Sequence, residues 1–539
     1  MDCRNLIVNN IKLPICASFE EAFSVAKARL KKSGIKCAGC KFSVYRRSVD
    51  ARKKDDIKFV YSIIVSGEIS NVTEERLKAA DAVPDKRVFP DPALGSKTLD
   101  KRPIIVGSGP AGLFCTLLLA EKGYSPILLE RGGSISERKA AVERFNKFGV
   151  LDTETNIQFG AGGAGTFSDG KLITRINDGM SSYVLEKFVE FGADPEIKYL
   201  AKPHIGTDVL CLIVDRMIER IRSLGGEVRF NTALKDITVT NGRISRIFTS
   251  EGEEKPGLLV LAIGHSARDT YEMLLSKNII VEAKDFSVGM RIEHLTEDID
   301  RAMYGKNAGN DRLGHAEYAL SHNTKERGVY TFCMCPGGEV VAAASEHGGL
   351  VVNGMSEHSR SGKNSNSAVV CSIFRSDYGS TPMSAINFQR KIERAAFSAG
   401  GEDYSAPIIT FSDFAGGTLK KLPSRIIPSY RGGEKVKLAA PESYLPDFVC
   451  DSIRNAIFAF DKKISGFASG DAVLTGAETR TSAPVRITRD PESRRALGIS
   501  NLYPCGEGAG YAGGITSAAI DGLRTAISII EEFKPFLLG

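Results

Sequence analysis

Three glycines at positions 107, 109 and 112 have a spacing that lets a chain wrap around a phosphate group. The first glycine permits a tight turn, the second lets a pyrophosphate approach the backbone, and the third lets a helix pack closely on a strand. The N–H groups at the start of the following helix attract phosphate, and the helix dipole adds to this attraction. The sequence therefore predicts a phosphate-binding turn made of Gly107, Ser108, Gly109, Pro110, Ala111 and Gly112.

An acidic residue stands where such a site needs a partner for a ribose. The apolar segment 127–129 ends in Glu130, eighteen residues after Gly112. A carboxylate at this place suits ribose hydroxyls and repels a ribose phosphate, and we place the neighbouring Arg131 in the same site. An apolar strand before the turn and an apolar helix at 113–122 complete a βαβ unit. The alternative is an ordinary glycine turn in such a unit, and the combination of strand, helix and terminal acid favours a dinucleotide site.

Two more glycine-rich stretches, at 160–165 and 508–513, match the same spacing. Neither lies between a strand and a crossover helix that leads to another strand, so we predict one dinucleotide site and no separate nicotinamide domain. Their backbone can still approach a flat ligand, and the positive end of the last helix would face an electron-rich ring. The predicted site therefore also includes Gly163, Gly165, Thr166, Ser168, Gly264, Gly506, Glu507, Gly513, Gly514 and Ile515. The alternative is that both stretches are structural turns.

Four residues with ionisable side chains are candidates for catalysis. His265 and Arg268 follow the end of a predicted strand, so the histidine could donate a proton and the arginine could hold an anionic substrate. Lys171 follows one glycine-rich stretch, and Arg480 precedes the other. In the alternative interpretation, Arg268 pairs locally with Asp269 and His265 is an ordinary loop residue.

The eleven cysteines are odd in number and scattered, which favours reduced thiols in a cytoplasmic compartment over a disulfide framework. Cys37 and Cys40 form a CxxC motif, and Cys333 and Cys335 form a CxC motif. A zinc site needs four ligands, and no second CxxC or HxxxH lies near either motif, so we predict no metal site. Packing thiols are favoured over functional ones.

At 539 residues, with 42% apolar and 25% charged residues, the chain is predicted to be a soluble protein of two to four domains. No apolar run approaches the roughly 18 residues of a membrane span. The first five residues lack the basic start of a secretory signal. We therefore expect a cytoplasmic protein without membrane contact.

Positive charge concentrates near the N-terminus, where residues 1–60 hold fourteen Lys or Arg and six Asp or Glu. Such a segment could follow the phosphates of a nucleic acid through Lys41, Arg46, Arg47 and Arg52. A solvated basic surface, partly balanced by nearby aspartates, is the simpler interpretation, and we favour it. A nucleic acid is thus the less favoured partner, and the oligomeric state is not predicted.

Hydrophobic periodicity divides the chain into four segments of α/β character. Residues 1–97 are typical of a small basic, ferredoxin-like α+β domain, with Ser18 and Glu21 as a capping box at its first helix. Residues 98–285 are predicted to form a doubly wound, Rossmann-like dinucleotide-binding domain, to which residues 471–539 return. Residues 286–470 are predicted to be an inserted α+β substrate or cap domain.

The glycine turn and Glu130 resemble the FAD-binding start of glutathione-reductase-type flavoproteins. Segments 258–264 and 501–507 are similar to the second and third fingerprints of that superfamily, although Glu507 stands where many relatives have an aspartate that binds the ribityl chain. Over nearly its whole length, the chain resembles a bacterial family of uncharacterised FAD-dependent, NAD(FAD)-utilizing dehydrogenases. The matching segments are 46–52, 163–172, 264–270, 331–338, 352–356 and 506–514.

The resemblance implies non-covalently bound FAD and an oxidoreductase that transfers a hydride between this flavin and a small-molecule substrate. The substrate and the direction of the reaction stay open. NADH or NADPH would bind only transiently, as a reductant, because no separate fold for it is visible. Two alternatives from other classes are a flavin-containing protein that binds or modifies RNA and a FAD-binding sensor without turnover.

Overall fold

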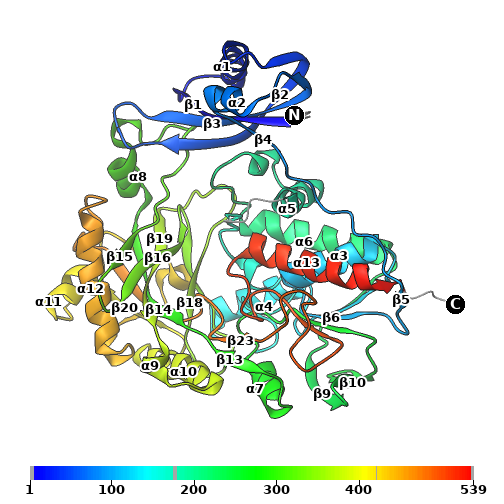
Figure 1. Cartoon of the computed structure of the whole chain (residues 1–539). Helices are drawn as coiled ribbons and strands as arrows, with labels where there is room; N and C mark the ends of the chain where they lie inside the picture. The colour runs from blue at the N-terminus through cyan, green and yellow to red at the C-terminus, as the bar shows by residue number, and fades with distance from the viewer. Residues whose placement is uncertain (1–4, 174–178, 421, 536–539) are drawn as a thin grey trace. The chain divides into compact units, whose positions relative to one another are not determined.

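The computed structural model describes residues 5–173, 179–420 and 422–535, in mixed α/β structure (Figure 1). The chain forms two compact units. The first comprises Met1–Pro90, Arg175–His204 and Glu297–Ala316, and the second comprises Asp91–Thr174, Ile205–Thr296 and Glu317–Gly539. The domain boundaries at 97, 285 and 470 stay predictions. The first four residues, on which the expectation about a secretory signal largely depends, lie outside the described part.

The first unit begins with a βαββαβ segment. Its elements are β1 (Asn5–Pro14), α1 (Phe19–Lys32), β2 (Lys36–Asp50), β3 (Lys58–Ser70), α2 (Glu74–Ala80) and β4 (Ala82–Pro84). The strands form an antiparallel sheet in the order β2-β3-β1-β4, which is the ferredoxin-like topology that the sequence predicts. Both helices lie on one face of this sheet (Figure 1). The capping box at Ser18 is confirmed, because Glu21 bonds back to the Ser18 N–H at 2.7 Å.

Two later stretches of the chain complete the first unit. They contain α5 (Gly179–Glu190), the 3-10 turns Pro195–Lys198 and Gly305–Asn307, and most of α8 (Thr296–Tyr304). Arg47 on β2 donates its backbone N–H to the Tyr199 carbonyl at 2.7 Å, and its guanidinium lies over the rings of Phe59 and Tyr199. This residue of the basic N-terminal segment is thus engaged inside its own unit.

The second unit is built on a five-stranded parallel sheet in the order β24-β12-β6-β7-β8. The strands are β6 (Ile104–Val106), β7 (Ile127–Leu129), β8 (Glu227–Arg229), β12 (Leu259–Leu261) and β24 (Leu502–Pro504). The helices α3 (Pro110–Glu121), α6 (Thr207–Ser223) and α13 (Ile515–Glu532) lie side by side (Figure 1). The predicted βαβ unit is confirmed as β6-α3-β7, and the C-terminal segment returns to this sheet through β24.

The apolar sequence of α3 follows from its position. Every residue from Ala111 to Ala120 is buried, so the helix needs no polar face. After it come α4 (Ile135–Phe148) and α7 (Arg268–Ser276). A meander of β9 (Leu234–Thr240), β10 (Arg243–Thr249) and β11 (Gly252–Glu254) forms a three-stranded sheet. Its first turn is the predicted Asn241-Gly242 hairpin, in which both residues have a positive φ.

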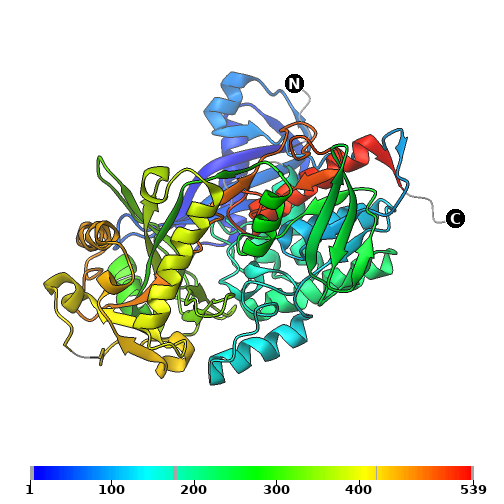
Figure 2. The same cartoon turned by 90° about the horizontal axis from the view of Figure 1, so that it is seen from below.

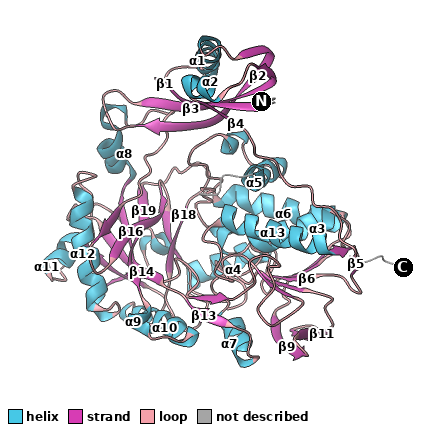
Figure 3. Cartoon of the chain, in the orientation of Figure 1, coloured by secondary structure: helices cyan, strands magenta, loops and turns pink. Residues whose placement is uncertain are grey.

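The second unit also contains a seven-stranded sheet, in the order β15-β16-β19-β14-β22-β20-β21. Figure 3 labels three of its strands, β14, β16 and β19. Its strands are β14 (Phe286–Leu295), β15 (Ser321–Asn323), β16 (Gly328–Cys335), β19 (Asn364–Ile373), β20 (Ala406–Thr410), β21 (Val436–Leu438) and β22 (Val473–Glu478). The helices α10 (Pro382–Ala399), seen lengthwise in Figure 2, and α12 (Asp447–Asp461) pack on it. Strand β22 lies beyond residue 470, where the sequence places the end of this segment.

Short pairs of strands connect the larger sheets. They are β5 (Lys97–Thr98) with β25 (Phe533–Lys534), β13 (Val281–Ala283) with β23 (Val485–Ile487), and β17 (Glu339–Ala342) with β18 (Val352–Met355). The short helix α11 (Phe411–Gly416) packs on β20, and the short helix α9 (Arg375–Tyr378) packs on α10. Within the described residues, no helix has the length and apolar character needed to cross a membrane.

Candidate functional site

A cavity of about 210 Å³ lies in the second unit, at the carboxyl ends of the parallel strands. Gly107 follows β6, Glu130 follows β7 and Gly264 follows β12, and all three line the cavity. Parallel α/β sheets bind ligands at this edge, because the strand ends and the helix starts meet there. The cavity is therefore the candidate functional site.

The glycine turn leaves room where a ligand would need it. A Cβ at Gly109 would meet only the Cα of Gly163, at 3.9 Å, whereas a Cβ at Gly107 would lie 2.3 Å from the Ala262 carbonyl oxygen. A Cβ at Gly112 would lie 1.8 Å from the Gly107 carbonyl oxygen. Gly107 and Gly112 are thus required by packing, and Gly109 faces open space, as the sequence predicts for the position next to a pyrophosphate.

Two helices begin at this cavity without a side-chain cap. The N-cap residues are Gly109 for α3 and Gly514 for α13, and neither glycine has a side chain that could bind the first N–H groups of its helix. The first N–H groups of such helices are free to bind an anion, and the helix dipole adds a partial positive charge. The backbone N–H groups at the starts of α3 and α13 therefore fit a phosphate-bearing group.

Glu130 is already supplied with hydrogen bonds by the protein. Its side chain is 4% exposed, and its Oε2 accepts the N–H and the hydroxyl of Ser108, at 2.8 and 2.7 Å. Its Oε1 accepts the N–H groups of Gly132 and Gly160, both at 3.0 Å. The carboxylate therefore holds the glycine turn, the loop after β7 and the second glycine stretch together.

The predicted site residues divide into two groups. The cavity is lined by Gly107, Gly109, Pro110, Ala111, Glu130, Arg131, Gly163, Gly165, Ser168, Lys171, Gly264, His265, Arg480, Glu507, Gly513, Gly514 and Ile515. The structure places behind this lining Ser108, Gly112, Thr166, Arg268 and Gly506. Ser108 is an instructive case, because its N–H points at Glu130 and so is not presented to a ligand.

Arg131 and Asp269 form an ion pair that sequence reasoning missed. Arg131 Nη2 lies 2.8 Å from Asp269 Oδ2, and the guanidinium lies over the Phe159 ring. The alternative in which Arg268 pairs locally with Asp269 is therefore wrong. Successive residues at the start of a helix point in different directions, and here Asp269 faces Arg131 while Arg268 turns inward.

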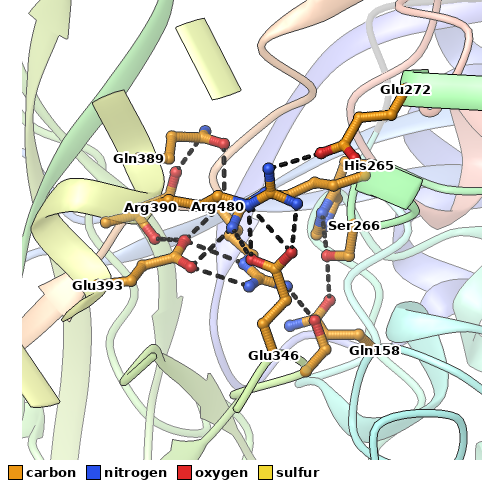
Figure 4. Close-up of polar contacts among 12 residues, drawn as sticks. Gln158, His265, Ser266, Glu272, Glu346, Gln389, Arg390, Glu393 and Arg480 are labelled. Atoms are coloured by element: carbon orange, nitrogen blue, oxygen red, sulfur yellow. Dashed lines mark hydrogen bonds and ion pairs between the residues drawn. The ribbon is translucent and has the colours of Figure 1, made fainter. Parts of the chain in front are cut away.

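Arg268 lies in a buried charge network, in which its guanidinium binds Glu393 through Nη2 at 2.7 Å and Glu346 through Nη1 at 2.6 Å. Figure 4 labels Glu346, Glu393 and Arg480 of this network. Arg480 binds the other oxygen of Glu393 at 3.0 Å. Burial alone raises the pKa of Glu393, but the two guanidiniums outweigh it and hold that pKa well below its usual range. The side chain of Arg268 is 1% exposed and does not line the cavity, so the structure gives it a structural place rather than the predicted contact with substrate.

The tautomer of His265 follows from a chain of hydrogen bonds (Figure 4). Gln158 Nε2 donates to the Ala343 carbonyl, which leaves Gln158 Oε1 to accept from the Ser266 hydroxyl at 3.2 Å. The Ser266 oxygen can then only accept from His265 Nδ1, which lies at 2.9 Å. Nδ1 therefore carries the proton, and Nε2 carries the lone pair.

His265 is neutral at ordinary pH. Burial, and then the charges of the neighbouring Arg480 and Arg268, lower its pKa to about 3. A neutral ring whose single N–H is used by Ser266 is a proton acceptor. The predicted role of His265 as a proton donor therefore does not fit the geometry, because sequence reasoning could not include the two buried arginines.

Lys171 belongs to a second charge cluster, centred on Asp169. Its ammonium lies 3.4 Å from Asp169 and 3.3 Å from Glu317, and Arg360 binds both acids at 2.6 Å. Burial raises the pKa of Asp169, but Lys171 and Arg360 outweigh it and hold that pKa at about 2. Glu317 and Arg360 lie far from Asp169 along the chain, and no local sequence pattern predicts that they contact it.

Glu507 contrasts with the other acids at the cavity. It lines the cavity, and its side chain has no hydrogen-bond partner in the part of the chain that the structure describes. Burial raises its pKa to about 7, and Lys284 only partly opposes this shift. A second missed residue, Asp521 of α13, accepts the N–H of Gly506 at 2.7 Å and so positions the loop that carries Glu507.

The CxC motif also reaches the cavity. Cys333 and Cys335 both line it, and Arg291 donates to the Cys333 carbonyl. Burial raises the pKa of both thiols to about 12, so neither is a ready nucleophile. The described residues contain no cluster of three or more His, Cys, Asp or Glu that could hold a metal ion.

Residues 285–481 match a family described as FAD-dependent protein, C-terminal domain-like, and residues 6–66 match a domain of unknown function (DUF8436). Solved structures that resemble the chain include a glycine oxidase from Bacillus cereus, at 11% identity, 80% of this chain, 95% of that chain and a TM-score of 0.31. Another is an L-amino acid deaminase from Proteus vulgaris, at 12% identity, 84% of this chain, 98% of that chain and a TM-score of 0.32. At these TM-scores the likeness does not bear on function.

A protein of Clostridium beijerinckii, described as uncharacterized, is much more similar. It is 44% identical over 532 residues, which are 98% of this chain and 98% of the relative. Such identity over nearly the whole length includes both compact units and the cavity. The chain therefore belongs to the family of this clostridial protein, and within it residues 285–481 match the C-terminal domain-like region of FAD-dependent proteins.

Proposed function

We propose that the protein is a FAD-dependent oxidoreductase acting on a small molecule. The observation that supports this most is the cavity at which two uncapped helices begin beside Gly109 and Gly514. The donor set suits a diphosphate, and the match of residues 285–481 to FAD-dependent proteins names the coenzyme that carries one. Bound FAD would supply the two-electron redox chemistry that hydride transfer requires.

The residues that would hold FAD come from three strand ends. The N–H groups at the start of α3 would bind the diphosphate, and Glu130 would fix the turn that presents them. Glu507, which lacks a hydrogen-bond partner among the described residues, would accept hydroxyl groups of the coenzyme. In this proposal, the positive end of α13 would lie toward the electron-rich ring.

The catalytic contribution of the chain itself would come from His265. Its bare Nε2 is a neutral acceptor that could take a hydrogen bond, and then a proton, from a hydroxyl or amino group of the substrate. Arg480 and Lys171 both line the cavity and carry N–H donors, so a substrate with hydrogen-bond acceptors fits the proposal. NADH or NADPH would serve as a transient reductant.

The test compares the wild-type protein with two matched glycine variants. Gly109→Ala adds a methyl group that meets only the Cα of Gly163, at 3.9 Å, so the fold tolerates it. The methyl group would occupy the place that this proposal gives to the diphosphate. We expect at least about tenfold weaker FAD binding, measured by titration of flavin fluorescence. Gly416→Ala, at another uncrowded glycine, should leave FAD binding unchanged. A colourless wild-type protein that takes up no added FAD contradicts the proposal.

A second experiment separates an enzyme from a sensor without turnover. The FAD-loaded protein is mixed anaerobically with NADH or NADPH, and bleaching of the flavin absorption is recorded. Reduction followed by reoxidation with a small-molecule acceptor supports an oxidoreductase. Flavin that neither reductant bleaches, and that no candidate substrate reduces, argues for a binding protein instead.

A further inference from the structure

The first unit carries a pair of cysteines that the proposed function does not use. Cys37 and Cys40 both lie on β2, an edge strand of the four-stranded sheet. In a regular strand, residues three apart point to opposite faces of the sheet. Regular geometry would therefore keep these two thiols apart.

A bulge at Gly39 removes this separation. Opposite the single residue Gly67 of β3, strand β2 places two residues, Gly39 and Cys40. Gly39 has a φ of 66°, the left-handed conformation that glycine adopts in such bulges. The extra residue shifts the alternation of faces by one position, so Cys40 comes to lie on the same face as Cys37.

The two thiols are in contact and accessible. The Cys37 side chain is hydrogen-bonded to Cys40, and Cys40 Sγ lies 3.6 Å from the Glu68 carbonyl oxygen. Gly67 leaves the space for Cys40, because a Cβ there would lie 3.2 Å from the Cys40 Cα. Both cysteines are partly exposed. The pair therefore combines proximity with access from solvent.

A metal does not account for the pair. No third His, Cys, Asp or Glu joins these thiols to make a metal cluster among the residues that the structure describes. Two accessible thiols in contact instead fit thiol–disulfide exchange, which needs no further ligand. Their place on an exposed edge strand lets another molecule reach the sulfurs.

We propose that Cys37 and Cys40 form a reversible disulfide by exchange with an external disulfide. The thiolate of Cys40 attacks one sulfur of that disulfide, its S–S bond breaks, and one thiolate leaves. The sulfur of Cys37 then loses its proton to solvent and attacks Cys40, which releases the second thiolate. The pair gives up two electrons and two protons, and the external disulfide becomes two thiols.

The hydrogen bond between the thiols sets the order of attack. Burial, and then the hydrogen bond and charge of Cys40, raise the pKa of Cys37 to about 12. Cys40 is therefore the nucleophile toward the external disulfide, and Cys37 is the residue that resolves the mixed disulfide.

The experiment places the full-length protein in buffers of varied ratio of reduced to oxidised glutathione. The fraction of the pair protected from alkylation is measured by mass spectrometry of the peptide that holds both residues. We expect an internal disulfide, lighter by two hydrogens, that dithiothreitol reverses. Cys16→Ser, which removes another exposed thiol of the same unit, should leave this equilibrium unchanged. A pair that stays reduced at every ratio contradicts the proposal.

Single variants test the order of attack. Cys37→Ser should trap glutathione on Cys40, and Cys40→Ser should react at least about tenfold more slowly with oxidised glutathione. Circular dichroism checks that both variants fold. Stable glutathione on Cys40 of the wild-type protein, or zinc that copurifies and is lost in both variants, would overturn the disulfide in favour of an adduct or a metal site shared between two copies.

Discussion

Glu130 and Glu507 are two acids at the same cavity, and the protein treats them in opposite ways. Glu130 accepts four hydrogen bonds from the chain around it. Glu507 has no side-chain hydrogen bond within the described residues, and burial raises its pKa to about 7. The protein itself fills the acceptor capacity of the Glu130 carboxylate, whereas the acceptor capacity of Glu507 is available to a ligand.

The difference separates positioning from binding. A carboxylate that four donors surround has little acceptor capacity left, so its main work is to hold loops in place. A carboxyl group without donors in a half-buried site is costly to ionise, and it gains most from a ligand that brings hydroxyl groups. At this site, the number of hydrogen bonds that the protein donates to an acid, rather than the residue type, therefore predicts the role of that acid.

The largest expected effect is at Glu393, which pairs with two buried arginines. Glu393→Ala leaves Arg268 and Arg480 buried without their counter-charge. We expect a loss of about 3–5 kcal/mol in the free energy of unfolding, measured by denaturant titration. The matched control is Glu143→Ala, which removes an exposed pair with Lys147 and should have little effect. Equal effects of the two changes would contradict the role of the network.

Glu130→Ala tests the first half of the comparison. It leaves the N–H groups of Ser108, Gly132 and Gly160 without an acceptor in a buried place. We expect a loss of about 3 kcal/mol in the free energy of unfolding of the FAD-free protein. Glu130→Gln, which keeps one oxygen, should lose less. Weaker FAD binding with unchanged stability would instead show that Glu130 acts on the ligand directly.

Glu507→Gln tests the second half through pH. Since the folded protein raises the pKa of Glu507 from 4.5 to about 7, folding takes up a proton between these values. Stability must therefore fall as pH rises through this window. We expect wild type to lose on the order of 2 kcal/mol relative to Glu507→Gln between pH 5 and pH 8, measured by urea unfolding. Parallel pH profiles for the two proteins would refute this.

The smallest effect is expected at His265, whose Nε2 is the other acceptor left for a ligand. With its pKa lowered to about 3 by burial and the two arginines, the ring should not titrate between pH 5 and pH 8 in nitrogen NMR spectra. Ser266→Ala removes the partner of Nδ1 and should allow both tautomers, at a cost of about 1 kcal/mol. A wild-type ring that titrates near neutral pH would contradict the neutral acceptor.

Local patterns predicted most elements of the fold. The β6-α3-β7 unit, the capping box of α1 and the Asn241-Gly242 hairpin are all confirmed, because each depends on neighbours in sequence. Strand β22 joins the seven-stranded sheet, although it lies beyond the predicted boundary at residue 470. Its partners, β14 and β20, lie far away along the chain, and no local signal tells which sheet a short apolar strand joins.

The residues of the candidate site were predicted only in part, because several of their contacts are made with distant segments of the chain. Glycine spacing and strand ends predicted fewer than half of the residues that line the cavity. The pairing of Arg268 and the protonation of His265 were beyond reach, since they depend on Glu393 and Arg480 from other segments. Arg360 and Glu317 belong to the charge cluster around Asp169, and no sequence pattern predicts this arrangement.

By itself, the sequence determined where backbone N–H groups could meet a phosphate, because turns and helix starts are set by residues a few positions apart. Only the tertiary structure decided which charged groups are satisfied by the protein and which remain for a ligand. The physical reason is that the energy of a buried charge depends on the donors and counter-charges that packing brings within a few ångströms, from any distance along the chain.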